Sequence, residues 1–200
     1  MKRTISVLSV MIATVAVMVS TSSAQIAGKD QVVGRVNSGG TILVGQNSDD
    51  SKFGPYFGGS IGYGVGYGVT LYVESGYGWT NYKSLDGLKL VQIPVLGGVT
   101  YNFGPWLNSS IIQPYIGASG GVFNYLLQQD GTTITVSGNE QKTTSFGLEG
   151  IVGISFKIDE HVAIDIRGKY DHVFSNKDNP GLETQEWNNI GVGGGISFSF

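Results

Sequence analysis

The sequence predicts an all-β fold, an eight-stranded antiparallel up-and-down transmembrane β-barrel with short turns at one end and longer loops at the other. Three observations lead to this prediction. Apolar residues recur at every second position in one segment after another, which is the period of a strand. After residue 24 no segment has the apolar spacing of an amphipathic helix. Glycine is abundant, at 32 of 200 residues, and suits strands that bend and approach one another closely.

The first 24 residues have the layout of a secretory signal peptide. Lys2 and Arg3 give a basic start, residues 5–19 are apolar apart from Ser and Thr, and Ser22 and Ala24 precede a cleavage site at the −3 and −1 positions. The alternative is a membrane anchor, but an apolar core of about 15 residues is short for a helical span of about 20. Cleavage after Ala24 leaves 10 basic and 15 acidic residues, a net charge of −5.

Composition excludes several functions. An acidic, weakly charged chain is a poor nucleic-acid binder. The absence of Cys rules out disulfides and thiolate metal sites, and two His residues offer little for another metal site, so no cofactor is expected. A high glycine content also occurs in disordered chains. The 10 Tyr, 9 Phe and 3 Trp, with the long runs of alternation, favour a folded domain instead.

The first three strands are predicted at residues 40–45, 53–63 and 67–80. Residues 25–39 are either a free leader or the start of the first strand, and residues 40–200 form the barrel domain. Between Phe53 and Trp79 nearly every odd position is apolar, whereas the even positions are mostly Gly, Ser or Thr. This run is too long for a single strand, so we expect a tight turn at residues 64–66.

The other five strands are predicted at residues 88–103, 112–128, 145–158, 162–174 and 189–200. Pro94 lies within the fourth strand, where it cannot donate a ladder hydrogen bond, so we expect a local bulge there. In the fifth strand Ile112 and Ile116 share one face, and Gln113 and Tyr115 share the other.

The charged face of the seventh strand distinguishes two kinds of barrel. A soluble barrel places apolar side chains inside, whereas a membrane barrel places them outside and encloses small or polar ones. The polar faces of most strands carry Gly, Ser and Thr, which suit the narrow interior of eight strands. The charged side chains that this alternation directs inward are Glu74, Glu149, Lys157, Asp165, Arg167, Lys169 and Asp171. Four acids and three bases can pair, which favours a lumen plugged by side chains over a gated ion path.

Connection lengths and aromatic residues support the same orientation. Long outer loops are predicted at residues 46–52, 81–86, 129–142 and 175–186, and short inner turns at residues 64–66, 104–110 and 159–161. Aromatic residues that gather near the inner ends of the strands are Tyr63, Tyr67, Tyr101, Phe103, Trp106, Phe156, Phe198 and Phe200. Those near the outer ends are Phe53, Phe57, Tyr77, Trp79, Tyr170 and Phe174. Such groups are typical of the aromatic girdles at the two membrane interfaces.

At this point the chain resembles the small outer-membrane β-barrel family, that is, the OmpA-type transmembrane domain and its relatives. Residues 40–45 (Gly-Thr-Ile-Leu-Val-Gly), 91–96 (Val-Gln-Ile-Pro-Val-Leu) and 114–118 (Pro-Tyr-Ile-Gly-Ala) are similar to strands of that family. The closing residues Ile196, Phe198 and Phe200 resemble the C-terminal signal read by the barrel-assembly machinery. The resemblance covers nearly all of residues 40–200. It implies an integral protein of a Gram-negative outer membrane, with periplasmic turns.

Three function classes follow. The first is a structural or surface-interaction barrel, whose partners are outer-membrane lipid, the assembly machinery and an extracellular ligand of the outer loops; we expect a monomer. The second is a narrow, porin-like pore for ions or small solutes. The third is a lipid-modifying hydrolase, which would have to use His172 with Ser145 or Ser175 as nucleophile. We expect the first class, and no enzyme.

Overall fold

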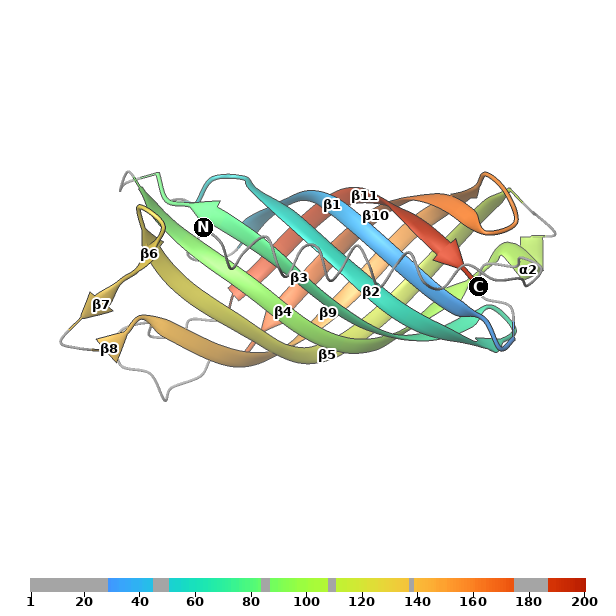
Figure 1. Ribbon diagram of the computed structural model, residues 1–200, viewed down its shortest axis with the longest axis horizontal. Coiled ribbons are helices and arrows are strands. Elements are labelled where there is room, and N and C mark those ends of the chain that lie inside the picture. Colours follow the sequence, from blue (N-terminus) through green and yellow to red (C-terminus); the bar gives the residue numbers. More distant parts are fainter. Residues whose placement is uncertain (1–28, 45–50, 84–86, 108–110, 137–138, 175–186) are drawn as a thin grey trace.

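The computed structural model describes residues 29–44, 51–83, 87–107, 111–136, 139–174 and 187–200, and it forms a closed barrel (Figure 1). The eight strands of the wall are β1 (Val32–Val44), β2 (Gly54–Gly66), β3 (Val69–Asn81), β4 (Leu88–Asn102), β5 (Ile112–Gln129), β9 (Lys142–Lys157), β10 (Val162–Val173) and β11 (Trp187–Ser199). Each strand pairs antiparallel with its neighbours along the chain, and β1 pairs with β11 to close the wall. The predicted eight-stranded up-and-down barrel is therefore confirmed.

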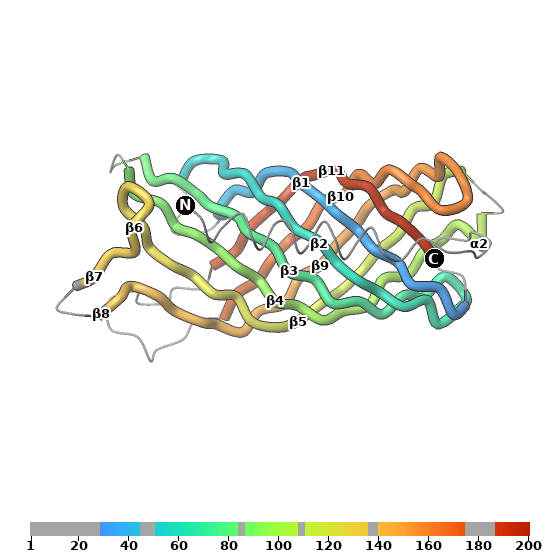
Figure 2. The backbone as a smooth tube through the Cα atoms, viewed as in Figure 1, coloured from blue at the N-terminus to red at the C-terminus, as the bar shows by residue number. Residues whose placement is uncertain are grey.

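The barrel is apolar outside, and the middle of its interior is polar. Along β10, Ile164, Ile166 and Tyr170 point outward and are exposed, Ile166 to 56%, whereas Asp165, Arg167 and Asp171 point inward and are buried. The outward-facing side chains of the other strands are likewise mainly apolar. Figure 2 shows these tilted strands lying side by side along the barrel. This is the arrangement of a membrane barrel, not of a soluble one. No helix in the described residues is long and apolar enough to cross a membrane.

β1 begins at Val32, so the strand extends well before residue 40. Val33, Asn37, Thr41 and Leu43 lie on its buried face. The extension pairs with both neighbours, from Val33 opposite Ser199 on β11 to Val32 opposite Tyr63 on β2. Residues 32–39 are therefore part of the wall and contribute side chains to its interior.

The first inner turn lies at Tyr67 and Gly68, and the predicted turn at residues 64–66 is wrong. Tyr67 and Gly68 have positive φ angles of 54° and 84°, as in a two-residue hairpin turn of the type that matches strand twist. The register shifts between Gly64 and Gly66, so a bulge lies where the turn was expected. Alternation alone could not locate the turn because it continues with the same parity on both sides.

The other inner connections are short. The segment after β4 contains one helical turn, α2 (Gly104–Leu107), which lies at the right of Figure 1 near the C-terminus. The β9–β10 connection is closed by Asp159, whose side chain accepts hydrogen bonds from the backbone N–H groups of His161 and Val162.

The connection after β5, expected to be a solvated loop, contains three short strands. They are β6 (Thr132–Thr133), β7 (Thr135–Val136) and β8 (Asn139–Glu140). Asp130 and Gly131, with φ angles of 50° and 83°, turn the chain so that β6 pairs with the end of β5. β7 and β8 then pair with each other and project from the end opposite the C-terminus (Figure 1). In the other three predicted outer loops, residues 46–50, 84–86 and 175–186 lie outside the described residues.

Pro94 does not produce the expected bulge. The β3–β4 register is the same on both sides of it, with Ser75 opposite Val95 and Gly78 opposite Gln92. The ladder pairs between these two positions are missing, and the Ser75 hydroxyl donates a hydrogen bond of 2.9 Å to the Pro94 carbonyl oxygen. Proline removes a donor without adding a residue, so the ladder is interrupted but not shifted.

Candidate functional site: the barrel lumen

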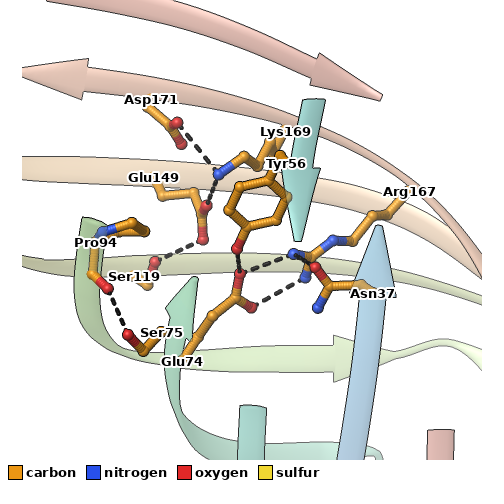
Figure 3. A network of polar contacts seen from close by, with 10 residues as sticks. All are labelled: Asn37, Tyr56, Glu74, Ser75, Pro94, Ser119, Glu149, Arg167, Lys169 and Asp171. Atoms are coloured by element: carbon orange, nitrogen blue, oxygen red, sulfur yellow. Dashed lines mark hydrogen bonds and ion pairs between the residues drawn. The ribbon is translucent and has the colours of Figure 1, made fainter. Parts of the chain in front are cut away.

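The centre of the lumen holds a bidentate ion pair between Arg167 of β10 and Glu74 of β3 (Figure 3). The two guanidinium nitrogens donate to the carboxylate oxygens of Glu74 at 3.0 and 2.7 Å. The Tyr56 hydroxyl donates to the same carboxylate at 2.9 Å, and the Asn37 side-chain oxygen accepts from Arg167 at 2.9 Å. Four strands are therefore joined through one buried, charge-assisted network.

A second group of charges surrounds Lys169, also in Figure 3. The Lys169 ammonium lies 3.1 Å from a Glu149 oxygen and 3.3 Å from an Asp171 oxygen. Ser119 donates to the other Glu149 oxygen at 3.0 Å. Lys169 also lies over the Tyr56 ring, 4.3 Å from its centre, which connects this group with the Arg167 network.

A third group lies closer to the inner end. Ser155 donates a short hydrogen bond to Asp165, and the Arg35 guanidinium lies over the Tyr115 ring at 5.1 Å. Six of the seven charged residues predicted for the lumen are buried in these groups, and the seventh, Lys157, is half-buried at the inner end of β9. Arg35, also half-buried, is a further base that the sequence analysis missed.

The outer part of the lumen is filled by apolar and aromatic side chains, which the sequence analysis did not predict. The buried members of this apolar cluster are Leu43, Leu90, Leu96, Phe123, Tyr125 and Val173, with Tyr82, Leu127 and Trp187 packed against them. The Tyr125 and Trp187 rings meet edge to face with their centres 4.5 Å apart. The expected filling by small and charged residues therefore describes only part of the lumen.

Glycines on the inward face make room for these large rings. A side chain at Gly153 would overlap the Tyr115 ring, and one at Gly76 would overlap the Tyr56 ring. The glycine content thus reflects close packing inside a narrow barrel as well as strand bending.

The predicted C-terminal signal lies on the outer face at the inner end. Ile196 is exposed, while Phe198 and Phe200 are half-buried there. Phe200 exchanges two backbone hydrogen bonds with Val32, at 2.9 and 3.0 Å, so the last residue still belongs to the wall. Nearby, Tyr101 and Phe103 stack edge to face, and at the outer end Trp79 stacks with Phe57 and Tyr77.

His172 and Ser145 lie on opposite faces of the wall. His172 points outward, with Nδ1 2.7 Å from the Asn188 side-chain oxygen and its ring against Phe174. Ser145 points inward and is buried. This pair cannot form a nucleophile and its base; Ser175 lies outside the described residues. No cluster of His, Cys, Asp and Glu suited to a metal ion occurs among residues that the structure describes.

A closed wall with an apolar exterior and a charged interior defines an integral β-barrel membrane protein. The chain belongs to the outer membrane protein beta-barrel domain family, which it matches over residues 9–198. A search of curated proteins finds no match.

Solved structures with the same fold include three outer-membrane proteins. Neisserial surface protein A is 19% identical with a TM-score of 0.63, over 84% of this chain and 97% of that one. Ail, the attachment invasion locus protein of Yersinia pestis, is 10% identical with a TM-score of 0.54, over 86% and 99% of the two chains. OprG from Pseudomonas aeruginosa is 14% identical with a TM-score of 0.52, over 88% and 99%. At these identities the similarity establishes the fold.

Proposed function

We propose that this chain is an integral outer-membrane protein with a structural or surface-interaction role and a lumen closed by side chains. The observation that carries the proposal is that the lumen is blocked at two levels. The Arg167 and Lys169 networks fill its middle, and the apolar cluster around Phe123 and Leu96 fills its outer part. Eight strands leave an interior only just wide enough for such side chains.

The names of two neighbours support a role at the cell surface. One is called a surface protein and another an attachment and invasion protein. In our chain the part available for contacts outside the cell is the set of outer connections, including the hairpin β7–β8.

The charge of the outer connections favours a neutral or cationic ligand over a polyanion. Residues 46–52, 81–86, 129–142 and 175–186 contain eight acidic and four basic residues, a net charge of −4. The acidic ones are Asp49, Asp50, Asp86, Asp130, Glu140, Asp178, Glu183 and Glu186, and the basic ones are Lys52, Lys83, Lys142 and Lys177. Like charges repel a polyanion at low ionic strength.

The remaining parts of the proposal concern export and partners. Residues 1–24, outside the described residues, act as the cleaved signal peptide. Lipid contacts the exposed apolar band, the assembly machinery binds the C-terminal residues, and the barrel is a monomer. We also propose that it is not an enzyme, which the His172 and Ser145 positions support. A phospholipid or lipid A hydrolysis assay, with His172→Ala as the control, tests that point.

The second candidate is a narrow pore, for which the buried charges in the middle of the lumen would supply polar contacts to a passing ion. Planar-bilayer recordings separate the two. We expect the wild-type barrel to show no steady conductance, and the double variant Leu96→Ala with Phe123→Ala to show some, because it removes the apolar cluster's two central side chains. A steady wild-type conductance that the double variant does not increase would contradict the closed lumen and support the pore.

A further inference from the structure

The middle of the lumen carries one uncompensated negative charge if all of its ionisable groups have their usual charge. Its acids are Glu74, Glu149 and Asp171, and its bases are Arg167 and Lys169, which the ion pairs and the Tyr56 side chain join into one group. All five are at most 7% exposed. Three acids and two bases give a net charge of −1.

The excess negative charge lies around Lys169. Arg167 is matched by Glu74 in the bidentate pair. Lys169, in contrast, is shared by two carboxylates, at 3.1 Å from Glu149 and 3.3 Å from Asp171. These two acids are direct neighbours across β9 and β10.

A buried charge without a partner is strongly unfavourable, and two carboxylates that share one site rarely both ionise. We propose that the Glu149–Asp171 pair binds one proton at neutral pH, so that the middle of the lumen is electrically neutral. The proton bonds to a carboxylate oxygen of the pair, and Lys169 then faces a single negative charge.

The surroundings fit a pair that keeps one charge. Lys169 and the Tyr56 ring face it from β10 and β2, and the Arg167–Glu74 pair adds no net charge beside it. From β5, Ser119 donates to Glu149. From β11, the buried Asn189 is directly opposite Asp171. Its side-chain amide is a donor that can solvate the remaining carboxylate.

The proton makes folding depend on pH with a definite sign. Exposed carboxyls of the unfolded chain are ionised above about pH 5, so in that range the folded barrel holds one proton more than the unfolded chain. Its folding equilibrium constant should therefore fall about tenfold per pH unit, until the folded pair also releases its proton. This pH dependence of folding is expected whether or not the lumen conducts ions.

Infrared spectroscopy of the refolded barrel in detergent micelles and D2O tests the proposal directly. We expect the carbonyl stretch of a protonated carboxylic acid at neutral pH in the wild type and in the control Glu140→Gln, which alters an exposed ion pair. Glu149→Gln and Asp171→Asn each mimic the protonated acid, so both should fold and both should lack the band. Denaturant titrations of the same proteins should show the tenfold change of the folding equilibrium constant per pH unit in the wild type and the control. The two variants lack the extra proton, so this tenfold change should be absent from their titrations.

Two results would overturn the inference. One is a wild type without the protonated-acid band at neutral pH, or a band that persists in both variants. The other is wild-type stability that does not respond to pH but changes when sodium or potassium replaces a bulky organic cation, because a metal ion would then supply the missing charge.

Discussion

At the residue scale, the lumen depends on a few charged side chains that have no access to water. Arg167 contacts both oxygens of Glu74 and the Asn37 side chain, and it is 6% exposed. An ion pair in such a place stabilises the fold only while both partners are present. Exposed pairs such as Lys142 with Glu140 contribute little.

Replacement of Arg167 by Ala should therefore destabilise the barrel by about 3–5 kcal/mol, because it leaves the Glu74 carboxylate buried without a cation. The matched change Lys142→Ala should cost at most about 1 kcal/mol. Denaturant titration of the refolded proteins in detergent measures both values. Equal stability of wild type and Arg167→Ala would mean that water reaches Glu74 and that the lumen is not dry.

The glycines provide a second test at this scale. A side chain at Gly39 of β1 would overlap the Val192 carbonyl oxygen on β11, whereas one at Gly150 of β9 meets no atom within 4 Å. We expect Gly39→Ala to lower the folded yield and Gly150→Ala to leave it unchanged or slightly higher, because alanine also restricts the unfolded chain. Heat-dependent mobility on gels distinguishes folded from unfolded protein. Similar yields for both variants would show that β1 and β11 can separate at Gly39 without cost.

At the element scale, strand alternation predicted the wall well because it reports directly on which face a side chain occupies. The polar face of β10 alone indicated the inside of the barrel. The same rule predicted the inward positions of Glu74 and Glu149, which the structure places in two buried ion pairs.

Other features could not be predicted from alternation. Odd-numbered residues are the apolar ones both before and after the turn at Tyr67, so alternation does not reveal the turn. Arg35 lies in a segment where apolar and polar residues alternate only weakly. The apolar cluster was hidden because Leu96 and Phe123 lie on faces where polar or small residues predominate elsewhere in the strand. The Arg167–Glu74 pair joins residues 93 apart, and only the closed barrel determines that they meet.

The end of β11 allows a prediction about assembly. Phe200 lies at the inner end of the wall and pairs with Val32 through its backbone. Loss of its half-buried ring should cost at most a few kcal/mol of burial, which a closed barrel can tolerate. We expect deletion of Phe200 to lower the amount of protein in the outer membrane while the purified chain still folds in micelles. Equal amounts in cells would leave Phe200 as a membrane-interface residue without a recognition role.

At the scale of the whole molecule, the apolar exterior and the charged interior have one physical explanation. Lipid offers no hydrogen bonds, so every backbone group of the wall must pair within a closed sheet. The side chains that remain polar can then only face inward, where they must neutralise one another. The central claim is that the chain is exported, cleaved and inserted as such a barrel.

Fractionation of cells, combined with the intact mass of the purified protein, shows whether the chain is exported, cleaved and inserted. We expect the protein in the outer-membrane fraction, resistant to extraction by carbonate, with a mature chain that starts at Gln25. A soluble protein in the periplasm, or an uncleaved chain held in the inner membrane by residues 1–24, would contradict the central claim.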